Sequence, residues 1–243
     1  HANQYINSTA GEFPNFEFIE QLQKALSKDE GTIFKFATHE NTILNAIRAQ
    51  LKASDAPNKE SLISFIESIS HHTKKNPDTW IVPNRKQNQG TRDMVDLCKV
   101  VVKYYYNPHT FGSNSIKKVL PAVLKSSQFV QEKYSRPINE IQVTSINIPS
   151  DHTWLTVKNG EIVDPYKTLP PVYDNISQDE IETRLSDMKN IDDGGAALTA
   201  YGKMQYTDMT EKEREDISDA LKRYCELDTL AMVMIYEHLK SII

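Results

Sequence analysis

The chain has 243 residues, of which 39% are hydrophobic and 25% are charged, and its formal net charge is −5. This composition is typical of a globular protein large enough to bury a core, and it excludes a chain that binds nucleic acid through an overall basic charge. The two cysteines, Cys98 and Cys225, lie far apart and argue against a disulfide scaffold or a zinc site. No apolar run has the length of a membrane span, so we expect a cytoplasmic protein. The chain begins with histidine rather than methionine, and we expect further residues before it.

The first half of the chain alternates helical and strand patterns. Helices are expected over residues 14–31, 39–54 and 59–70. Residues 32–38 are rich in β-branched and aromatic residues, as in a short strand, and residues 93–106 indicate a strand that runs into a helix. Residues 107–124 indicate a turn-rich loop and a short helix that stops near Pro121. Strand followed by helix, repeated, predicts an α/β fold with helices packed on a sheet.

The segment from about 125 to 195 has a different pattern. Residues 138–148 and 153–166 both carry strand patterns. Asn159 followed by Gly160 is a strong hairpin signal. We expect a β-hairpin insertion at about 138–166, because the segment has too few apolar residues to build a core of its own. A glycine-punctuated connection over 192–210 follows, and the whole chain is interpreted as one domain over 1–243.

The last predicted element is a long helix over about 210–242. Thr210 with Glu213 three residues later forms a capping-box pattern at its start. Within it, "YCELD" places Tyr224 and Asp228 four residues apart on one helix face, beside an apolar stripe: Leu221, Cys225, Met232 and Ile235. A carboxylate that faces a core is costly unless it is paired or binds a metal. The pair is either half of a catalytic site or part of a solvated helix face.

Two further carboxylates occur where ligands collect in α/β sheets. Glu40 opens a helix directly after a predicted strand; alternatively, Glu40 and His39 complement the helix N-terminus. Asp96 of "MVDL" lies in an apolar run, so we expect it to be paired, to end a strand, or to accept a hydrogen bond from a backbone amide.

Longer stretches of the sequence show a resemblance to known proteins. "HENTIL", "MVDL", "YYYNPHTFGSNSIKKVLPAVL", "WLTVKNGEIVDPYKTLPP", "GGAALTAYGKMQYTDM" and "RYCELDTLAMVMIYEHL" resemble a bacterial family whose domain has no known function. The order of these motifs is similar to that of the ribonuclease H-like superfamily, in its DnaQ-like branch of 3′→5′ exonucleases with a tyrosine in the last motif (DEDDy). The resemblance implies a ribonuclease H-like exonuclease fold, α/β with a mixed sheet and helices on both faces, whose opening strands are missing from this chain. In that family the domain often follows a RecB- or Cas4-like nuclease region.

The resemblance also implies a reaction and its residues. Such enzymes hydrolyse phosphodiester bonds with two divalent metal ions, Mg²⁺ or Mn²⁺, held by four carboxylates. Glu40 and Asp228 match two of these metal ligands, and Tyr224 matches the tyrosine that orients the attacking water. These three residues are therefore the expected catalytic residues. The expected partner is the 3′ end of DNA or RNA.

Other residues match supporting positions. The resemblance implies that Asp96 and His39 are structural residues or lie directly behind the metal ligands. Ser113, Ser115 and Lys117 match the loop and helix near the substrate strand, where hydroxyls, a helix N-terminus and a positive charge can hold phosphate.

The first motif of these exonucleases, Asp-x-Glu, occurs nowhere in the 243 residues. We therefore expect the nuclease site to be complete with an Asp-x-Glu upstream of His1, and this chain alone to be inactive. The alternative is a non-catalytic module that keeps the fold and binds nucleic acid or protein. An Asp-x-Glu at the end of an upstream apolar strand would favour the enzyme.

Overall fold

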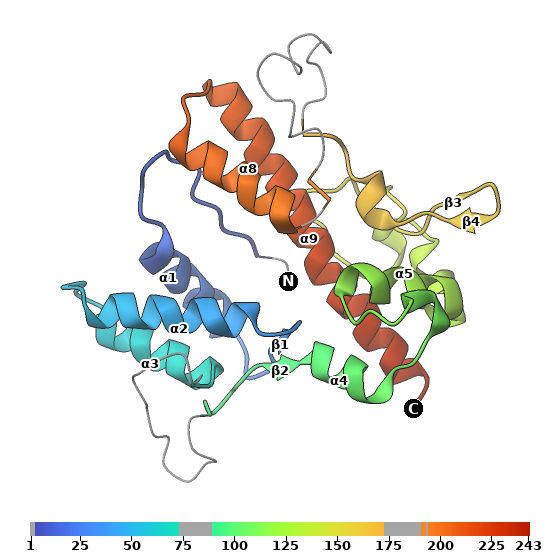
Figure 1. The fold of residues 1–243 in the computed structure, drawn as a ribbon, viewed down its shortest axis with the longest axis horizontal. Helices are drawn as coiled ribbons and strands as arrows, with labels where there is room; N and C mark the ends of the chain where they lie inside the picture. The colour runs from blue at the N-terminus through green and yellow to red at the C-terminus, as the bar shows by residue number, and fades with distance from the viewer. Residues whose placement is uncertain (1–2, 73–88, 173–190, 193) are drawn as a thin grey trace. The chain divides into compact units, whose positions relative to one another are not determined.

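The computed structural model describes residues 3–72, 89–172, 191–192 and 194–243. The chain divides into two compact units (Figure 1). One unit comprises residues 13–106, and the other comprises residues 107–243 together with residues 1–12. Helices dominate both units, and the described strands form two small sheets of two strands each, so the fold is mixed α/β. A single domain over 1–243 with an insertion at about 125–195 stays a prediction.

The described residues of the 13–106 unit form four helices and a parallel pair of strands. Its elements are α1 (Asn15–Leu26), β1 (Phe34–Lys35), α2 (His39–Lys52), α3 (Lys59–Ile69), β2 (Val95–Asp96) and α4 (Leu97–Tyr104). Helices α2 and α3 lie side by side (Figure 1). Strands β1 and β2 pair in parallel, with Lys35 opposite Asp96. These elements confirm the predicted helices in this part of the chain and the strand that runs into a helix.

Helical spacing of apolar residues explains the core of this unit. α1, α2 and α3 each bury one face, and the buried residues form one cluster: Ile19, Leu44, Ile47, Leu51, Leu62, Ile63, Ile66, Ile69 and Met94. Gly90 lies against the end of α3, and a Cβ at this position would lie 2.4 Å from the carbonyl oxygens of Glu67 and Ser68. The close approach of two backbones therefore requires glycine at this position.

The 107–243 unit packs its shorter elements against one long helix. Its elements are η1 (Pro108–Thr110), α5 (Ile116–Ser126), α6 (Gln128–Tyr134), η2 (Ile138–Glu140), β3 (Val157–Lys158), β4 (Glu161–Ile162), η3 (Pro165–Thr168), α8 (Gly194–Tyr206) and α9 (Glu211–Ser241). α9 contacts α5, α6, α8 and η3, and α8 lies along it (Figure 1). Although α9 has 31 residues, neither it nor another described helix is both long and apolar enough to cross a membrane.

The start of α9 confirms the predicted capping box. The Thr210 hydroxyl accepts the Glu213 N–H, and the Glu213 carboxylate accepts the Thr210 N–H at 2.7 Å. The predicted apolar stripe is partly wrong, because Cys225 is exposed. The buried face of α9 instead carries the following apolar residues: Ile217, Leu221, Tyr224, Leu227, Leu230, Ala231, Met234 and Ile235. Asp228 lies at the edge of this face, with its side chain 37% exposed.

The hairpin prediction is confirmed within residues 138–166. β3 and β4 are antiparallel, with Val157 opposite Ile162. Asn159 and Gly160 connect them with φ of 52° and 81°, the left-handed conformation of a type I′ turn. The strand expected over 138–148 is wrong, because that segment begins with η2 and holds none of the described strands.

Two other local predictions are wrong because tertiary packing overrides backbone preference. α5 continues through Pro121 to Ser126, although the proline removes one helical hydrogen bond. Leu120, Val123 and Leu124 of the same helix are 0% exposed, so burial stabilises it. The expected connection over 192–210 contains α8, whose Ala200 and Met204 are also 0% exposed, in a helix that packs against α9.

Candidate functional site

A cluster of four side chains, one of which is Asp228, lies in the 107–243 unit. The Lys117 ammonium donates to Asp228 Oδ1 at 2.9 Å, and the Tyr166 hydroxyl donates to the same oxygen. Lys117 Nζ lies 3.0 Å from the centroid of the Tyr166 ring and 4.3 Å from that of Tyr224. The two tyrosine rings are 6.1 Å apart. We call these four residues the Asp228 cluster.

Three elements bring the Asp228 cluster together. Lys117 lies in the first turn of α5, and Tyr166 lies in η3, where the Asp164 carboxylate accepts the Tyr166 N–H at 3.1 Å. Tyr224 and Asp228 come from successive turns of α9. Because α9 contacts both α5 and η3, side chains distant in sequence meet at one edge of its buried face.

The environment of the cluster favours the neutral form of Tyr166. Burial, and then the negative charge of Asp228, raise the pKa of the Tyr166 phenol well above its ordinary value of 10.0. The phenol therefore stays protonated and donates its hydrogen bond to the carboxylate. Two donors on one oxygen fix the orientation of Asp228, and none of these contacts falls on Oδ2.

Tyr166 was missed by the sequence analysis. In "VDPYKTLP" the aspartate followed by proline signals a short helical turn. That signal explains η3, but it holds no information on Asp228, 62 residues later. The contact depends on how η3 packs against α9, which no local pattern encodes.

Ser113 and Ser115 lie in the loop that leads into α5. Ser115 is the residue before the helix, and its carbonyl accepts the N–H groups of Lys118 and Val119. The Ser113 hydroxyl accepts the Ser115 N–H at 3.3 Å. The two serines and Lys117 lie at the start of α5, and their role in binding a substrate strand stays a prediction.

In the 13–106 unit, Asp96 makes the contacts of a structural residue. Its side chain is 6% exposed and pairs with Lys35 Nζ at 3.2 Å, and Lys35 is itself 1% exposed. Asp96 Oδ1 accepts the N–H of Ala37 and of Cys98, both at 3.0 Å, and so caps α4. The pair joins β1 to β2 and holds Ala37, a residue with φ of 72°, between β1 and α2.

Glu40 lies three residues after Ala37, in the first turn of α2. Its Oε1 accepts the Phe36 N–H at 3.4 Å, a long hydrogen bond. Its Oε2 is buried and has no hydrogen-bond partner among the described residues. His39, the preceding residue, is exposed. A buried carboxylate oxygen without a partner is unfavourable unless it binds a cation or a proton.

The carboxylates suit hard divalent cations, whose preferred ligands are oxygens. Glu40 Oε2 is a buried oxygen donor of this kind. Among the described residues, however, no three or more His, Cys, Asp or Glu side chains form a group that could hold a metal ion. Glu40 and Asp228 could therefore each supply one ligand to a metal ion. Glu40 and Asp228 belong to different units, and their meeting at one metal stays a prediction.

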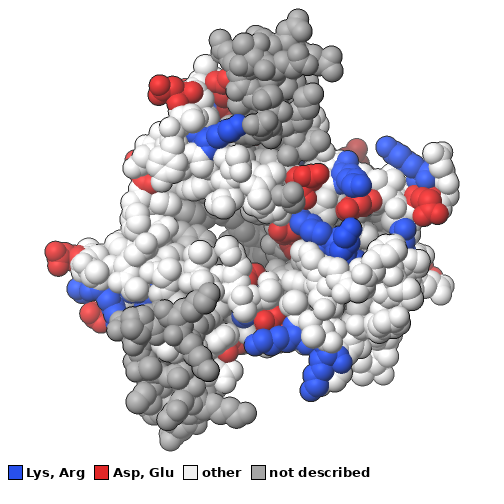
Figure 2. Space-filling view, in the orientation of Figure 1, with Lys and Arg blue, Asp and Glu red and all other residues white. Residues whose placement is uncertain are grey.

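The surface charge around α5 is mixed. Over α5 and the β3–β4 hairpin, Lys and Arg side chains lie beside Asp and Glu side chains (Figure 2), and Lys125 Nζ lies 3.6 Å from Glu161. A site for a nucleic-acid strand in this region would therefore depend on particular side chains such as Lys117 rather than on a broad basic surface.

These features define a mixed α/β protein, mostly helical, with carboxylates at a strand end and on a long helix. A family model described as a domain of unknown function (DUF2779) matches residues 1–115. The matched segment includes Glu40, Asp96, Ser113 and Ser115 but ends before the Asp228 cluster. It agrees with the resemblance to a bacterial family of unknown function. Neither a curated protein nor a solved structure matches the chain.

Proposed function

We propose that the chain is part of a metal-dependent 3′→5′ exonuclease that hydrolyses phosphodiester bonds of DNA or RNA, with a ribonuclease H-like, DnaQ-like fold. The observation that carries the proposal is the buried Oε2 of Glu40, which has no hydrogen-bond partner among the described residues. Glu40 lies in the helix that follows strand β1 of the parallel pair. Ligands of α/β sheets bind at the carboxyl ends of such strands. A divalent cation would satisfy Glu40 Oε2.

The Asp228 cluster supports the same proposal. Tyr224 and Asp228 lie one helical turn apart, and the phenol ring and the carboxylate both adjoin Lys117. In the proposed reaction, bound Mg²⁺ or Mn²⁺ would activate the attacking water and stabilise the leaving 3′ oxygen. Glu40 and Asp228 would hold the ions, and the Tyr224 hydroxyl would orient the water.

In the proposed enzyme Ser113, Ser115 and Lys117 would bind the substrate strand, as the resemblance implies. Ser113 and Ser115 at the start of α5 would donate hydroxyl and backbone N–H groups to phosphate. These contacts carry no sequence information, so the proposed enzyme would act on strand ends of any sequence. The proposal also requires an Asp-x-Glu pair, which the sequence does not contain.

The test is digestion of single-stranded DNA and RNA, labelled at the 5′ end, by the protein expressed from its whole gene. The proposal predicts stepwise shortening from the 3′ end that requires Mg²⁺ or Mn²⁺ and is lost in Glu40→Gln and in Asp228→Asn. Digestion that persists in both variants would show that these carboxylates are not its metal ligands. A protein that carries an upstream Asp-x-Glu and digests neither strand would contradict the proposal.

A second function, a non-catalytic module that binds nucleic acid or protein, is favoured by one observation. The negative charge of Asp228 already has a counter-ion in Lys117, at 2.9 Å, and the described residues hold no group of three metal ligands. A folded module would need no metal at this position. Tight binding of labelled strands without metal and without digestion would support this function.

A further inference from the structure

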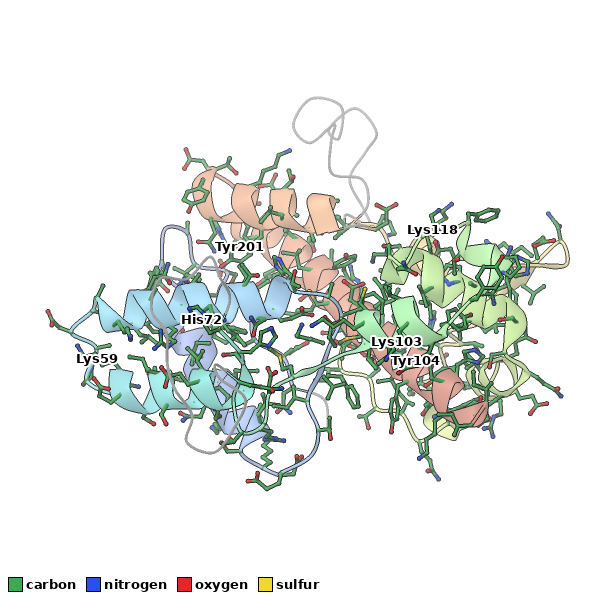
Figure 3. All side chains as sticks on the ribbon, turned by 60° about the horizontal axis from the view of Figure 1, so that its bottom comes forward. Lys59, His72, Lys103, Tyr104, Lys118 and Tyr201 are labelled. Carbon is green, nitrogen blue, oxygen red and sulfur yellow. The ribbon has the colours of Figure 1, made fainter. Side chains whose placement is uncertain are left out.

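Helix α4 and the two residues after it carry large apolar side chains in contact with solvent. Val102 is 60% exposed, Tyr104 70% and Tyr106 91%. Lys99 and Lys103 are exposed among them, and Lys103 and Tyr104 lie at the C-terminal end of α4 (Figure 3). We call these five residues the α4 surface. Exposed apolar side chains that lie together, rather than singly, mark a surface that binds a partner.

The remaining residues of this segment hold the α4 surface in place. Leu97 and Val101, on the other side of α4, are 3% and 1% exposed. The Tyr105 N–H donates to the Val101 carbonyl at 2.9 Å and ends the helix. Tyr105 has an extended backbone and is half-buried, and successive side chains of extended backbone point to opposite sides. Tyr106 is therefore directed to solvent by a neighbour that packs inward.

The charge of the segment indicates the partner. Residues 97–131 contain five lysines and no Asp or Glu, although the whole chain has more acidic than basic residues. Lys103 Nζ lies 4.8 Å from the centroid of the Tyr104 ring, so a group stacked on this ring lies beside a positive charge. A single strand of nucleic acid offers both flat bases for the rings and phosphates for the lysines. An apolar protein surface would cover the rings but would not pair with the lysines.

We propose that the α4 surface binds single-stranded DNA or RNA, with bases stacked on Tyr104 and Tyr106 and phosphates beside Lys99 and Lys103. Aromatic rings stack on every base, so the surface accepts strands of any sequence. The bases of a duplex are already stacked on one another, so the surface selects single strands. The inference rests on the proposed function only in that nucleic acid is the ligand, and it requires no metal ion.

The experiment measures the fluorescence anisotropy of labelled single-stranded and duplex oligonucleotides during titration with the 243-residue chain. EDTA is present, so that no metal-dependent digestion occurs. Tyr106→Ala should bind the single strand roughly 5- to 150-fold less tightly, the effect of one lost stacking contact, and should bind the duplex like the unaltered chain. Tyr106→Phe keeps the ring and should stay within about twofold of the unaltered chain. Tyr206→Ala removes a ring of α8 that is 86% exposed and should also leave the affinity unchanged.

Titrations at several salt concentrations test the lysines. For single strands, each phosphate contact contributes about 0.7 to the slope of log K against log salt concentration. Lys103→Gln should therefore reduce this slope by about 0.7. Lys24→Gln removes the same charge from an exposed position of α1 and should leave the slope unchanged.

The inference and the proposed function fail on different results. Equal single-strand binding by Tyr106→Ala and the unaltered chain would overturn the inference and leave the proposed function standing, and so would a chain that binds no single strand but digests one when expressed from its whole gene. Self-association that Tyr106→Ala abolishes, while strand binding persists, would assign the surface to a second copy of the chain instead. Single-strand binding that depends on Tyr106, in a whole-gene protein that digests nothing, would uphold the inference and contradict the exonuclease. Circular dichroism and melting temperature verify that each variant is folded.

Discussion

Tyr224 is buried, 4% exposed, but its ring adjoins Lys117 in the Asp228 cluster. Phenylalanine keeps the ring and its burial, so Tyr224→Phe should leave the melting temperature almost unchanged. In a form of the protein that digests nucleic acid, its turnover should fall by roughly 10²–10⁴-fold, the effect of one positioned acid–base group. Asp228→Asn should lower turnover further, because it removes a metal ligand and its charge.

The alternative interpretation, in which the pair belongs to a helix face, predicts the opposite order. Tyr224→Phe would then be nearly silent in activity, and Asp228→Asn would change stability because Lys117 and Tyr166 lose their charged acceptor. Digestion rates and melting temperatures of both variants separate the two interpretations. Full activity of Tyr224→Phe would assign the hydroxyl to packing alone.

Gly90 in the 13–106 unit lies where a side chain has no room. A Cβ there would meet the backbone carbonyl oxygens of Glu67 and Ser68 at 2.4 Å, and backbone atoms at the end of α3 cannot move aside cheaply. Gly90→Ala should therefore lower the free energy of unfolding by about 1–3 kcal/mol or more. Urea denaturation followed by circular dichroism measures the loss. A stability equal to that of the unaltered chain would mean that the two segments lie farther apart.

At the scale of an element, α8 contains a glycine that its packing does not require. A Cβ at Gly202 would meet no atom within 4 Å, and the residue lies in the middle of the helix. Glycine in a helix interior is less favourable than alanine. Gly202→Ala should raise the free energy of unfolding by about 0.5–1 kcal/mol. The same urea experiment measures the gain, and a loss of stability would show that α8 is not helical at this position.

A partly buried hydrogen bond joins helices α6 and α9 and should make stability depend on pH in the alkaline range. Tyr134 is 0% exposed and its hydroxyl donates to Glu237 at 3.0 Å. Burial, and then the charge of Glu237, raise the pKa of Tyr134 above its ordinary value of 10.0. The unfolded chain therefore loses this proton first, so the contribution of Tyr134 is complete below about pH 10 and falls above it.

Tyr134→Phe removes both the bond and its pH dependence. At neutral pH the variant should be less stable by about 1.5–3 kcal/mol, the range for a hydrogen bond to a charged group. Between about pH 9 and about pH 11 its stability should fall less steeply than that of the unaltered chain. Tyr206→Phe, at a residue that is 86% exposed, serves as the control and should match the unaltered chain in both measurements.

For the whole molecule, the proposed nuclease requires residues of both units at one metal. Glu40 lies in the 13–106 unit and Asp228 in the 107–243 unit. Because few ligands are present, we expect the chain to bind Mn²⁺ weakly, on the order of 10⁻³ M, and to digest no nucleic acid. If the two carboxylates share a metal, Glu40→Gln and Asp228→Asn should each weaken binding, and the double variant should lose less than the sum of the two effects.

The double variant also tests whether the two carboxylates bind the same metal ion. Effects that add fully would indicate two independent cation sites, one in each unit, because distant and unconnected sites behave additively. Robust Mn²⁺-dependent digestion by the 243-residue chain would show that the catalytic carboxylates lie elsewhere in the sequence. Calorimetric titrations of the four proteins and a digestion assay of the unaltered chain provide these measurements.

Local features of the sequence determined most of the helices. Apolar residues at helical spacing define α1, α2 and α3, since one face of each helix must be buried whatever its neighbours are. The Asn159–Gly160 turn and the Thr210 capping box depend on residues within three or four positions, so the sequence encodes them directly. The same spacing placed Tyr224 and Asp228 on one side of α9.

Tertiary structure alone decided the features that join distant segments. α5 passes through Pro121, and α8 forms despite its glycines, because both bury side chains against the rest of their unit. Lys117 meets Asp228 across 111 residues, and the contact exists because α5 packs on α9. The sequence by itself therefore determined which residues carry charge and which helix face they occupy. Long-range packing decided that a lysine, and not another carboxylate, lies beside Asp228.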